Sequence, residues 1–259
     1  MKIGAYQFAV TSDMKHNMDI IEKAVRRASE EKVKLLVFPE CALTGYPPHD
    51  IENPSEIDFE QLAVFYEQIQ TMAINYDIYI IVGTIIRENK KYFNSAITFS
   101  PDCENIVYHK RALWGWDKEN FCVGNKSGIF EIDGIKIGVR ICFEVRFPEF
   151  FRELYKEGTD LNIILFYDVS NKEDFQRYEL MKSHIRTRAV ENVCYTLTAN
   201  TIRPYQTAPT ALFDRSGYVL KELEPNTEEM LIYDLNDTQL DFGEQGRKCL
   251  SDLLITNSD

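Results

Sequence analysis

Short apolar runs rich in Val, Ile and Leu alternate with segments of helical periodicity along most of the chain. Within residues 17–31, for example, Ile21, Val25 and Ala28 recur at the spacing of one helical face. The predicted buried strands are 3–8, 33–38, 77–83, 161–167 and 192–199. The predicted helices are 17–31, 58–75, 148–157 and 174–190. This alternation predicts an α/β fold in which sheets and helices form layers.

The middle and the end of the chain are richer in strands. A hairpin is predicted where GIFEI and IKIGVRIC flank Asp133-Gly134, because Asp-Gly is a strong two-residue hairpin turn. Further short strands are predicted near 92–99, 105–109, 208–213, 218–222 and 230–234. These strands favour mixed sheets over a purely parallel sheet. Since no low-complexity linker and no internal repeat interrupts the pattern, we interpret residues 1–259 as a single domain.

The chain is acidic, with a formal net charge of −12 and a pI of about 4.9. An acidic surface repels nucleic-acid phosphates and anionic lipid headgroups, so we expect neither nucleic acid nor a membrane surface as a partner. No uncharged apolar stretch approaches the roughly 18 residues that a membrane-spanning helix needs. The opening residues MKIGAYQFAV lack the pattern of a signal peptide, which favours a cytoplasmic location.

The cysteines are widely and irregularly spaced, and free buried thiols are the expectation for most of them in a reducing compartment. They are Cys41, Cys103, Cys122, Cys142, Cys194 and Cys249. Cys142 ends the run KIGVRIC, where a buried strand emerges, and FEVRFPEFF then turns into a helix. Reactive groups gather at the carboxyl ends of strands, and N–H groups at a helix start favour a thiolate. Cys142 is therefore a candidate nucleophile, with a buried core cysteine as the alternative.

Three charged residues also follow or lie close to predicted strands. Glu40 comes directly after VKLLVF and Pro39, and a carboxylate in such apolar surroundings can act as a general acid or base near neutral pH. Lys110 follows the run 105–109, and a buried ammonium can stabilise an oxyanion. Glu119 lies nearby among aromatic residues. Taken singly, Glu40 is as well explained as a capping or salt-bridged glutamate, Lys110 is more typical of a solvated basic pair, and Glu119 is typical of a surface charge.

Together these side chains supply a nucleophile, a base and a cation at the ends of different strands, which is the set that amide hydrolysis requires. A serine hydrolase is disfavoured because no G-x-S-x-G segment occurs. His16, His49, His109 and His184 form no metal-ligand spacing, and no glycine-rich nucleotide motif is present. We therefore expect neither a metal nor a cofactor.

Three segments resemble the motifs of the carbon–nitrogen hydrolases, also called the nitrilase superfamily. LLVFPECALTGY (35–46) resembles the segment around the catalytic glutamate, YHKRALW (108–114) the lysine segment, and GVRICFEVRFPE (138–149) the cysteine segment. Further matches are FRELYKEGTDLNII, RTRAVENVCYTLTAN and FDRSGYVL. The resemblance follows the expected order and covers essentially the whole chain.

The resemblance implies a four-layer α-β-β-α sandwich with two mixed sheets, which pairs into a homodimer or a larger homo-oligomer. It implies that Glu40, Lys110 and Cys142 are catalytic. Glu119, in E-N-F-C-V-G, corresponds to a second glutamate of many members, and we expect it to orient Lys110 or the substrate amine. The implied reaction converts a small amide to an acid and ammonia through a thioester, with Lys110 and the Phe143 N–H stabilising the oxyanion.

The substrate is less well defined, because the loops that shape the pocket depart from the family pattern. Tyr167 and Asp168 follow the strand 161–166, where relatives often carry Pro and Trp. We expect Tyr46, Tyr167 and Asp168 to contact the substrate, and the Asp168 carboxylate to favour amides that carry an amino group. Alternatively, Asp168 caps the following helix or forms a structural ion pair with Arg146.

Other functions also fit these residues. Hydrolysis of N-carbamoyl amino acids would use the same catalytic set. The segment LTGYPPHDI (43–51) resembles the glutaminase part of glutamine-dependent NAD synthetases, so a subunit that supplies ammonia to a partner is another alternative. A catalytically silent binding module is disfavoured by the intact Glu40, Lys110 and Cys142.

Overall fold

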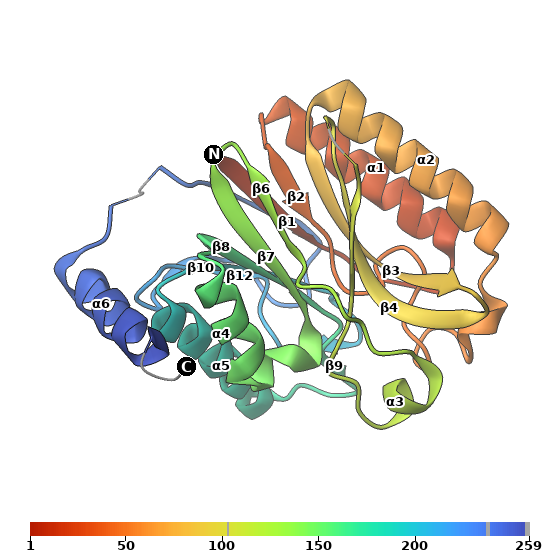
Figure 1. The fold of residues 1–259 in the computed structure, drawn as a ribbon. Helices are drawn as coiled ribbons and strands as arrows, with labels where there is room; N and C mark the ends of the chain where they lie inside the picture. Colours follow the sequence, from red (N-terminus) through yellow and green to blue (C-terminus); the bar gives the residue numbers. More distant parts are fainter. Residues whose placement is uncertain (103, 237–238, 257–259) are drawn as a thin grey trace.

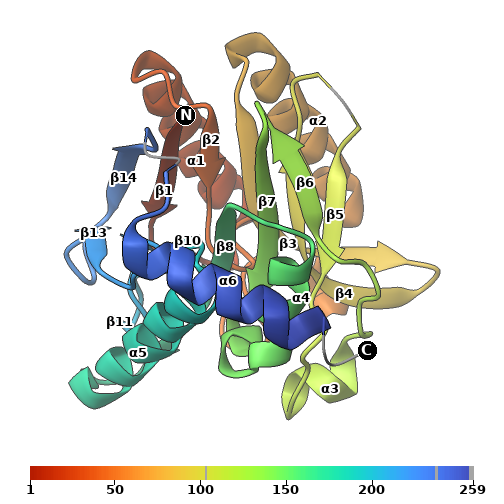
Figure 2. The same ribbon diagram turned by 60° about the vertical axis from the view of Figure 1, so that its left-hand side comes forward.

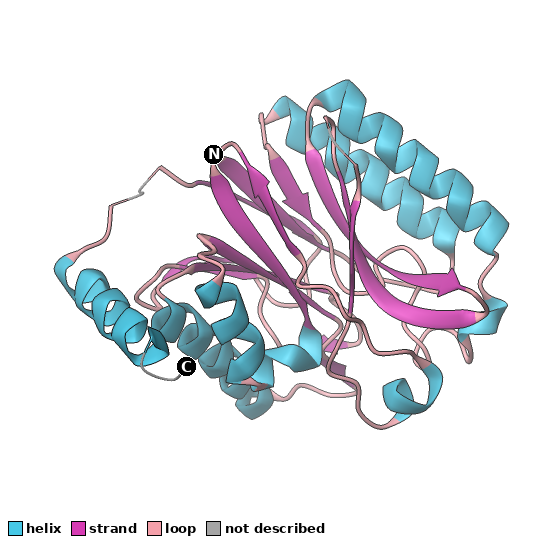
Figure 3. Ribbon diagram, in the orientation of Figure 1, coloured by secondary structure: helices cyan, strands magenta, loops and turns pink. Residues whose placement is uncertain are grey.

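A computed structural model describes residues 1–102, 104–236 and 239–256; Cys103 lies outside these ranges. Two six-stranded sheets stack face to face, and helices cover the outer face of each sheet (Figure 1, Figure 3). Both sheets contain parallel and antiparallel pairs. The predicted α/β class and the four-layer α-β-β-α sandwich with two mixed sheets are therefore confirmed.

The first sheet carries the amino-terminal strands. In spatial order they are β14 (Glu229–Asp234), β1 (Lys2–Gln7), β2 (Leu35–Val37), β3 (Tyr79–Glu88), β4 (Lys91–Phe99) and β5 (Ile106–His109). The strands β1, β2 and β3 run parallel, with Val37 of β2 opposite both Ala5 and Ile81. The helices α1 (Met14–Glu30) and α2 (Phe59–Tyr76) cover the outer face of this sheet (Figure 1).

The second sheet carries the carboxyl-terminal half of the chain. In spatial order its strands are β13 (Val219–Glu222), β12 (Ala211–Phe213), β10 (Tyr195–Asn200), β8 (Leu161–Phe166), β7 (Ile135–Ile141) and β6 (Ile129–Ile132). The strands β7, β8 and β10 are parallel, so their carboxyl ends lie at one edge. The crossovers α4 (Pro148–Lys156) and α5 (Phe175–Asn192) cover the outer face (Figure 1). The predicted hairpin at Asp133-Gly134 joins β6 to β7.

Shorter elements complete the chain. They are η1 (Pro54–Glu56), α3 (Trp116–Asn120), η2 (Cys142–Arg146), the paired strands β9 (Val169–Ser170) and β11 (Tyr205–Gln206), and α6 (Phe242–Thr256). The sequence pattern did not predict α6, which lies across α4 and α5 in Figure 2. The Tyr155 hydroxyl donates to Asp252 at 2.6 Å and thereby ties α6 to α4. Within the described ranges, no helix combines the length and the apolar character needed to cross a bilayer.

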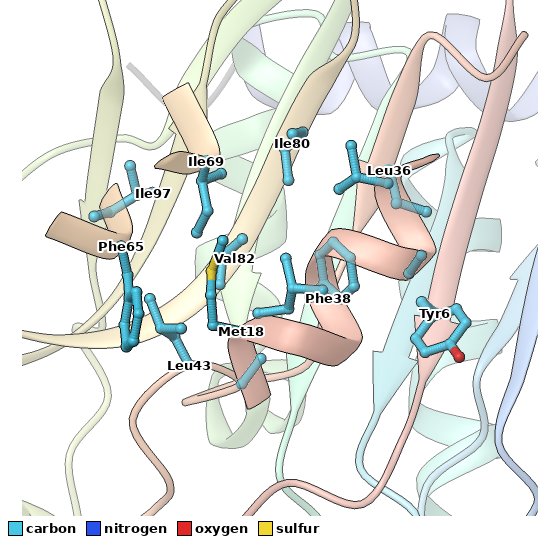
Figure 4. Packing of buried hydrophobic residues seen from close by; sticks show 14 of the residues in the cluster. Tyr6, Met18, Leu36, Phe38, Leu43, Phe65, Ile69, Ile80, Val82 and Ile97 are labelled. Atoms are coloured by element: carbon cyan, nitrogen blue, oxygen red, sulfur yellow. The ribbon is translucent and has the colours of Figure 1, made fainter. Parts of the chain in front are cut away.

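Each interface between layers has its own apolar core. In Figure 4, Leu36, Ile80 and Val82 of the first sheet pack against side chains of the helices that cover it. Leu35 and Val37 alternate with Leu36 along β2 and belong instead to the cluster between the two sheets. A third cluster joins the second sheet to α4 and α5. The strand β2 is therefore buried on both faces, and the loop that follows it is tied to β3 by backbone hydrogen bonds such as that from the Leu43 N–H to the Gly83 oxygen.

Candidate active site

Loops from both sheets converge at the carboxyl ends of the parallel strands. Glu40 follows β2, Cys142 follows β7, Tyr167 follows β8, and Lys110 follows β5. The Glu40 N–H donates to the Phe166 carbonyl oxygen across the two sheets, at an N···O distance of 3.2 Å. The fold therefore brings together the three residues that were predicted to be catalytic.

A cavity of about 330 Å³ opens over these loops. Cys142 and Lys110 lie in its wall. Four more of the predicted residues line it: Tyr46, Phe143, Tyr167 and Asp168. Among the residues that the structure describes, no group of three or more His, Cys, Asp or Glu side chains is arranged to hold a metal ion.

Lys110 is the centre of a buried charge cluster. Its Nζ lies 2.8 Å from Oε1 of Glu40 and 2.9 Å from Oδ2 of Asp117. Lys110 and Glu40 are only 2% and 1% exposed, so water screens these contacts little. Burial by itself lowers the pKa of Lys110, but the neighbouring acidic groups, Glu40 foremost, hold it well above its ordinary value. Lys110 therefore stays a cation that can face a developing oxyanion.

Both oxygens of the Glu40 carboxylate accept hydrogen bonds. Asn94 Nδ2 donates to Oε1 at 2.7 Å, and the Tyr167 N–H donates to Oε2 at 2.9 Å. Asn94 lies on β4 and is buried, and sequence reasoning missed it. The signal that could have identified Asn94 is its position as a polar residue in the middle of an apolar strand rather than at its end. These donors fix the carboxylate beside Lys110 and Cys142.

A glycine on β3 permits the position of Glu40. A Cβ on Gly83 would lie 2.2 Å from the Pro39 carbonyl oxygen and 2.6 Å from Cα of Glu40. The loop after β2 is tied to β3 at this point, because the Gly83 N–H donates to the Pro39 oxygen at 3.2 Å. No other residue type leaves room for the loop so close to the strand.

Cys142 lies at the turn from β7 into η2. Its φ of +44° is in a region that side chains with a Cβ rarely adopt, which marks a strained position held by its surroundings. Burial, and then the negative charge of Glu40, raise the pKa of the Cys142 thiol well above its ordinary value, and Lys110 offsets this only in part. These surroundings favour the thiol over the thiolate, against the sequence-based expectation that the helix start favours a thiolate.

Glu144 connects the cysteine and lysine segments, and sequence reasoning missed it. It is fully buried, and its Oε2 accepts from the Ile141 N–H at 2.6 Å. Its Oε1 accepts from the Arg111 N–H and from the Tyr108 hydroxyl, each at 2.7 Å. Ile141 directly precedes Cys142, and Arg111 directly follows Lys110. One carboxylate therefore holds the backbones of both catalytic segments.

The second acidic partner of Lys110 is Asp117 rather than Glu119, so the prediction that Glu119 orients this lysine is wrong, and its alternative role toward the substrate amine stays a prediction. Glu119 is exposed, whereas Asp117 also accepts from the Tyr46 hydroxyl at 2.6 Å. The reason is helical geometry: Asp117 lies one turn before the buried Phe121 and shares its inward direction, while a residue two positions later points away. The signal that could have identified Asp117 is its position four residues before the apolar Phe121, on the same face of the helix.

The substrate-binding predictions have mixed outcomes. Tyr46 and Tyr167 stack in the cavity wall, with ring centroids 4.9 Å apart. Asp168 is buried, and both of its oxygens face Arg177, at 2.9 Å from Nε and 3.1 Å from Nη2. The Thr207 hydroxyl donates to the same carboxylate. Asp168 therefore forms an ion pair, as the alternative anticipated, but with Arg177 rather than Arg146. Its selection of amino-bearing amides stays a prediction.

Comparison with known proteins places the chain in a family. The carbon-nitrogen hydrolase family matches residues 2–241. The 2-oxoglutaramate amidase of Bacillus subtilis (strain 168) is 29% identical over 184 residues, which are 70% of this chain and 66% of that protein. Omega-amidase NIT2 of Xenopus tropicalis is 26% identical over 219 residues, which are 78% of this chain and 75% of that protein.

Among solved structures, the NitN amidase from Nesterenkonia sp. AN1 matches with a TM-score of 0.81 at 24% identity, over 100% of both chains. This likeness supports the same fold, and the family match extends over nearly all of the chain described above. The resemblance inferred from the three sequence motifs is confirmed. The chain belongs to the carbon-nitrogen hydrolase family, as a hydrolase that acts on amides.

Proposed function

We propose that this hydrolase cleaves a small carboxamide to a carboxylic acid and ammonia through a thioester on Cys142. The observation that carries the proposal is that the Cys142 thiol and the Lys110 ammonium share one cavity, while the fixed Glu40 carboxylate contacts that ammonium. These groups are a nucleophile, an electrophilic stabiliser and a base within one buried site. The names of the two relatives, both amidases, support the same reaction class.

The first half-reaction forms the thioester. Glu40 accepts the thiol proton as the Cys142 sulfur bonds to the amide carbon, which matches a thiol that is protonated at rest. Lys110 and the backbone N–H of Phe143, in the first turn of η2, stabilise the oxyanion. A well-placed donor of this kind contributes about 3 kcal/mol. The C–N bond then breaks, and Glu40 returns its proton to the departing ammonia.

The second half-reaction releases the acid. Water gives a proton to Glu40 and attacks the thioester carbon, and the same two donors stabilise the second oxyanion. The C–S bond breaks, the acid leaves, and the sulfur regains its proton from Glu40. Lys110 keeps its charge throughout, because Glu40 and Asp117 both contact its Nζ.

Two other hydrolytic functions use the same residues. An N-carbamoyl amino acid would release carbon dioxide as well as ammonia, and a glutaminase-type subunit would release ammonia from glutamine. No contact in the site favours either one over a simple carboxamide. Measuring ammonia and carbon dioxide together over carboxamides, carbamoyl amino acids and glutamine distinguishes the three.

The thioester provides the direct test. Mass spectrometry of the intact protein, mixed briefly with a short amide, should show an acyl adduct that maps to Cys142. Cys142→Ala should show no adduct and no ammonia release. The matched control Cys122→Ala, at a half-buried cysteine outside the cavity wall, should retain both. Ammonia release by Cys142→Ala at the wild-type rate would refute the proposal.

A further inference from the structure

We propose that a groove at the start of α5 binds a small organic cation of the alkylated ammonium class. The groove has a volume of about 400 Å³, which lies within the usual range for small-molecule sites. It is separate from the catalytic cavity, because no residue lines both hollows. The ligand is therefore one for which the proposed amidase reaction does not account.

Three segments that are distant in the sequence form this groove. They are the start of α5 with Glu173 and Asp174 before it, the strand β11, and the turn 224–226 between β13 and β14. The Gln206 N–H donates to Oδ1 of Asn226, and the Asn226 N–H donates to Oε1 of Gln206, each at 2.8 Å. This reciprocal pair fixes the turn against β11, so two walls of the groove are held in place without a ligand.

Aromatic side chains supply part of the lining. They are Phe175, Tyr178 and Tyr205. Phe175 is 76% exposed and Tyr205 is 37% exposed, so both rings keep accessible surface at the groove, whereas Tyr178 is nearly buried. The face of an aromatic ring carries negative charge density and attracts a cation that lies over it.

Elsewhere in the molecule, arginine side chains cover aromatic faces. Cζ of Arg152 lies 4.2 Å from the ring centre of Tyr155, and Cζ of Arg215 lies 4.6 Å from that of Tyr195. In the part of the chain that the structure describes, no lysine or arginine lies over the three rings of the groove, and none lines it. These rings can therefore accept a cation from outside the chain.

The carboxylates of the groove also lack a positively charged partner. Glu173 and Glu224 line it and are exposed, and no Lys, Arg or His nitrogen of the described residues lies within 4.0 Å of either carboxylate. By contrast, Glu222, which lies outside the lining, is paired with Lys182 at 2.5 Å. Asp174 caps the first turn of α5, and its charge offsets the positive end of that helix. The lining therefore has three acidic side chains and no basic one.

The hydroxyl of Tyr178 responds to this negative environment. Burial raises its pKa, and the hydrogen bond that it donates to Glu222 at 2.8 Å raises the pKa further. The negative charges of Glu179 and Glu224 act in the same direction. Surroundings that disfavour an additional negative charge favour a positive one.

The chemistry of the groove selects one kind of cation. Within the described ranges, no three His, Cys, Asp or Glu side chains are arranged to hold a metal ion, so the acidic residues of the groove do not form a metal site. Aromatic faces favour a cation with alkyl groups, because these groups contact the rings directly while the charge interacts with the ring electrons. An alkylated ammonium ion therefore matches both the rings and the carboxylates.

The test compares choline with its neutral analogue, in which a carbon atom replaces the nitrogen and the shape is nearly unchanged. Binding of each to the full-length wild-type protein is titrated by isothermal calorimetry at low ionic strength. We expect choline to saturate one site with a dissociation constant lower than that of the neutral analogue by about tenfold or more, the scale of a cation over aromatic rings. Added salt should weaken the binding of choline more than that of the analogue.

Variants assign this binding to the groove. Phe175→Leu removes an aromatic face, and Glu224→Gln removes a charge, and both side chains are exposed enough that the fold should persist. Each change should weaken choline binding several-fold. The matched controls are Phe242→Leu, at a residue of α6 that is 93% exposed, and Glu131→Gln, at an exposed position of β6. Neither control residue lines the groove, so both variants should bind choline as the wild type does.

Several results would overturn the proposal. Equal affinities for choline and its neutral analogue, or no saturable binding of choline, would remove the cation site. Unchanged binding in both groove variants would place the ligand elsewhere. In Cys142→Ala, which should not hydrolyse amides, a saturating concentration of butyramide should leave choline binding unchanged. Competition between the two would instead place choline in the catalytic cavity. None of these results depends on whether the protein releases ammonia, so the amidase proposal is tested separately.

Discussion

At the scale of single residues, Glu40 has two opposing effects on Cys142. It is the base that removes the thiol proton during attack, yet at rest its negative charge helps to raise the pKa of that thiol. A raised pKa means that less thiolate is present at neutral pH than for a free cysteine. We therefore expect Cys142 to be alkylated more slowly at neutral pH than a free cysteine.

Glu40→Gln separates these effects. The side chains are nearly isosteric, so the fold should persist, and turnover should fall by about a hundredfold or more, the scale of general acid–base catalysis. Alkylation of Cys142 by iodoacetamide at pH 8 should become faster, because removing the negative charge lowers the thiol pKa and increases the thiolate fraction. In the wild type, the rate of Cys142 alkylation should continue to rise with pH above the pH range in which an ordinary thiol titrates. Slower alkylation together with normal turnover would contradict both roles.

Glu144 acts through other residues, so its replacement should affect the chemistry more than binding. In Glu144→Gln, an amide oxygen replaces one acceptor and an NH₂ group faces a backbone N–H, which leaves a buried donor unpaired at a cost of about 2 kcal/mol. We expect kcat to fall with little change in KM, because the Cys142 and Lys110 segments lose their common acceptor.

The matched control for this variant is Tyr108→Phe, which removes one donor to Glu144 and neither backbone contact. It should cost about 1 kcal/mol of stability in urea unfolding and leave kcat nearly unchanged. If Glu144→Gln raised KM and spared kcat, the positioning role would be excluded.

At the scale of elements, the approach of the β2 loop to β3 decides where the base is placed. Gly83→Ala would put a Cβ 2.2 Å from the Pro39 oxygen, so the loop that carries Glu40 must shift. We expect a loss of at least about 2 kcal/mol in unfolding free energy, typical of overpacking, and a large loss of kcat. Gly246→Ala in α6, where nothing lies within 4 Å of the added Cβ, should be neutral or slightly stabilising. Wild-type turnover in Gly83→Ala would show that Glu40 tolerates displacement.

At the scale of the whole molecule, the outer helix layer of the second sheet presents apolar side chains to solvent. Phe147, Phe175 and Leu180 are 37%, 76% and 51% exposed. Since exposed apolar surface of this kind often marks an interface, we predict a homodimer or larger homo-oligomer. Light scattering at micromolar concentration should give at least twice the 30.2 kDa of one chain. A species of single-chain mass would exclude this assembly.

The sequence by itself determined the layers and the principal catalytic candidates. Strand and helix periodicities are local, and Glu40, Lys110 and Cys142 each follow a strand end that a local pattern can identify. The helix α6 escaped prediction because its apolar residues are largely exposed, so that its pattern lacks a clear buried face.

The tertiary structure alone decided which charges meet. The Tyr167 N–H reaches Glu40 across 127 positions of the chain, and Glu144 reaches Arg111 across 33. Asp117 contacts Lys110 whereas Glu119 does not, because a short helix presents them in different directions, and Asp168 forms an ion pair with Arg177. A carboxylate can act as a base, accept hydrogen bonds from two backbone segments or form an ion pair, according to the groups within about 3 Å of it. Only the folded chain brings those groups together.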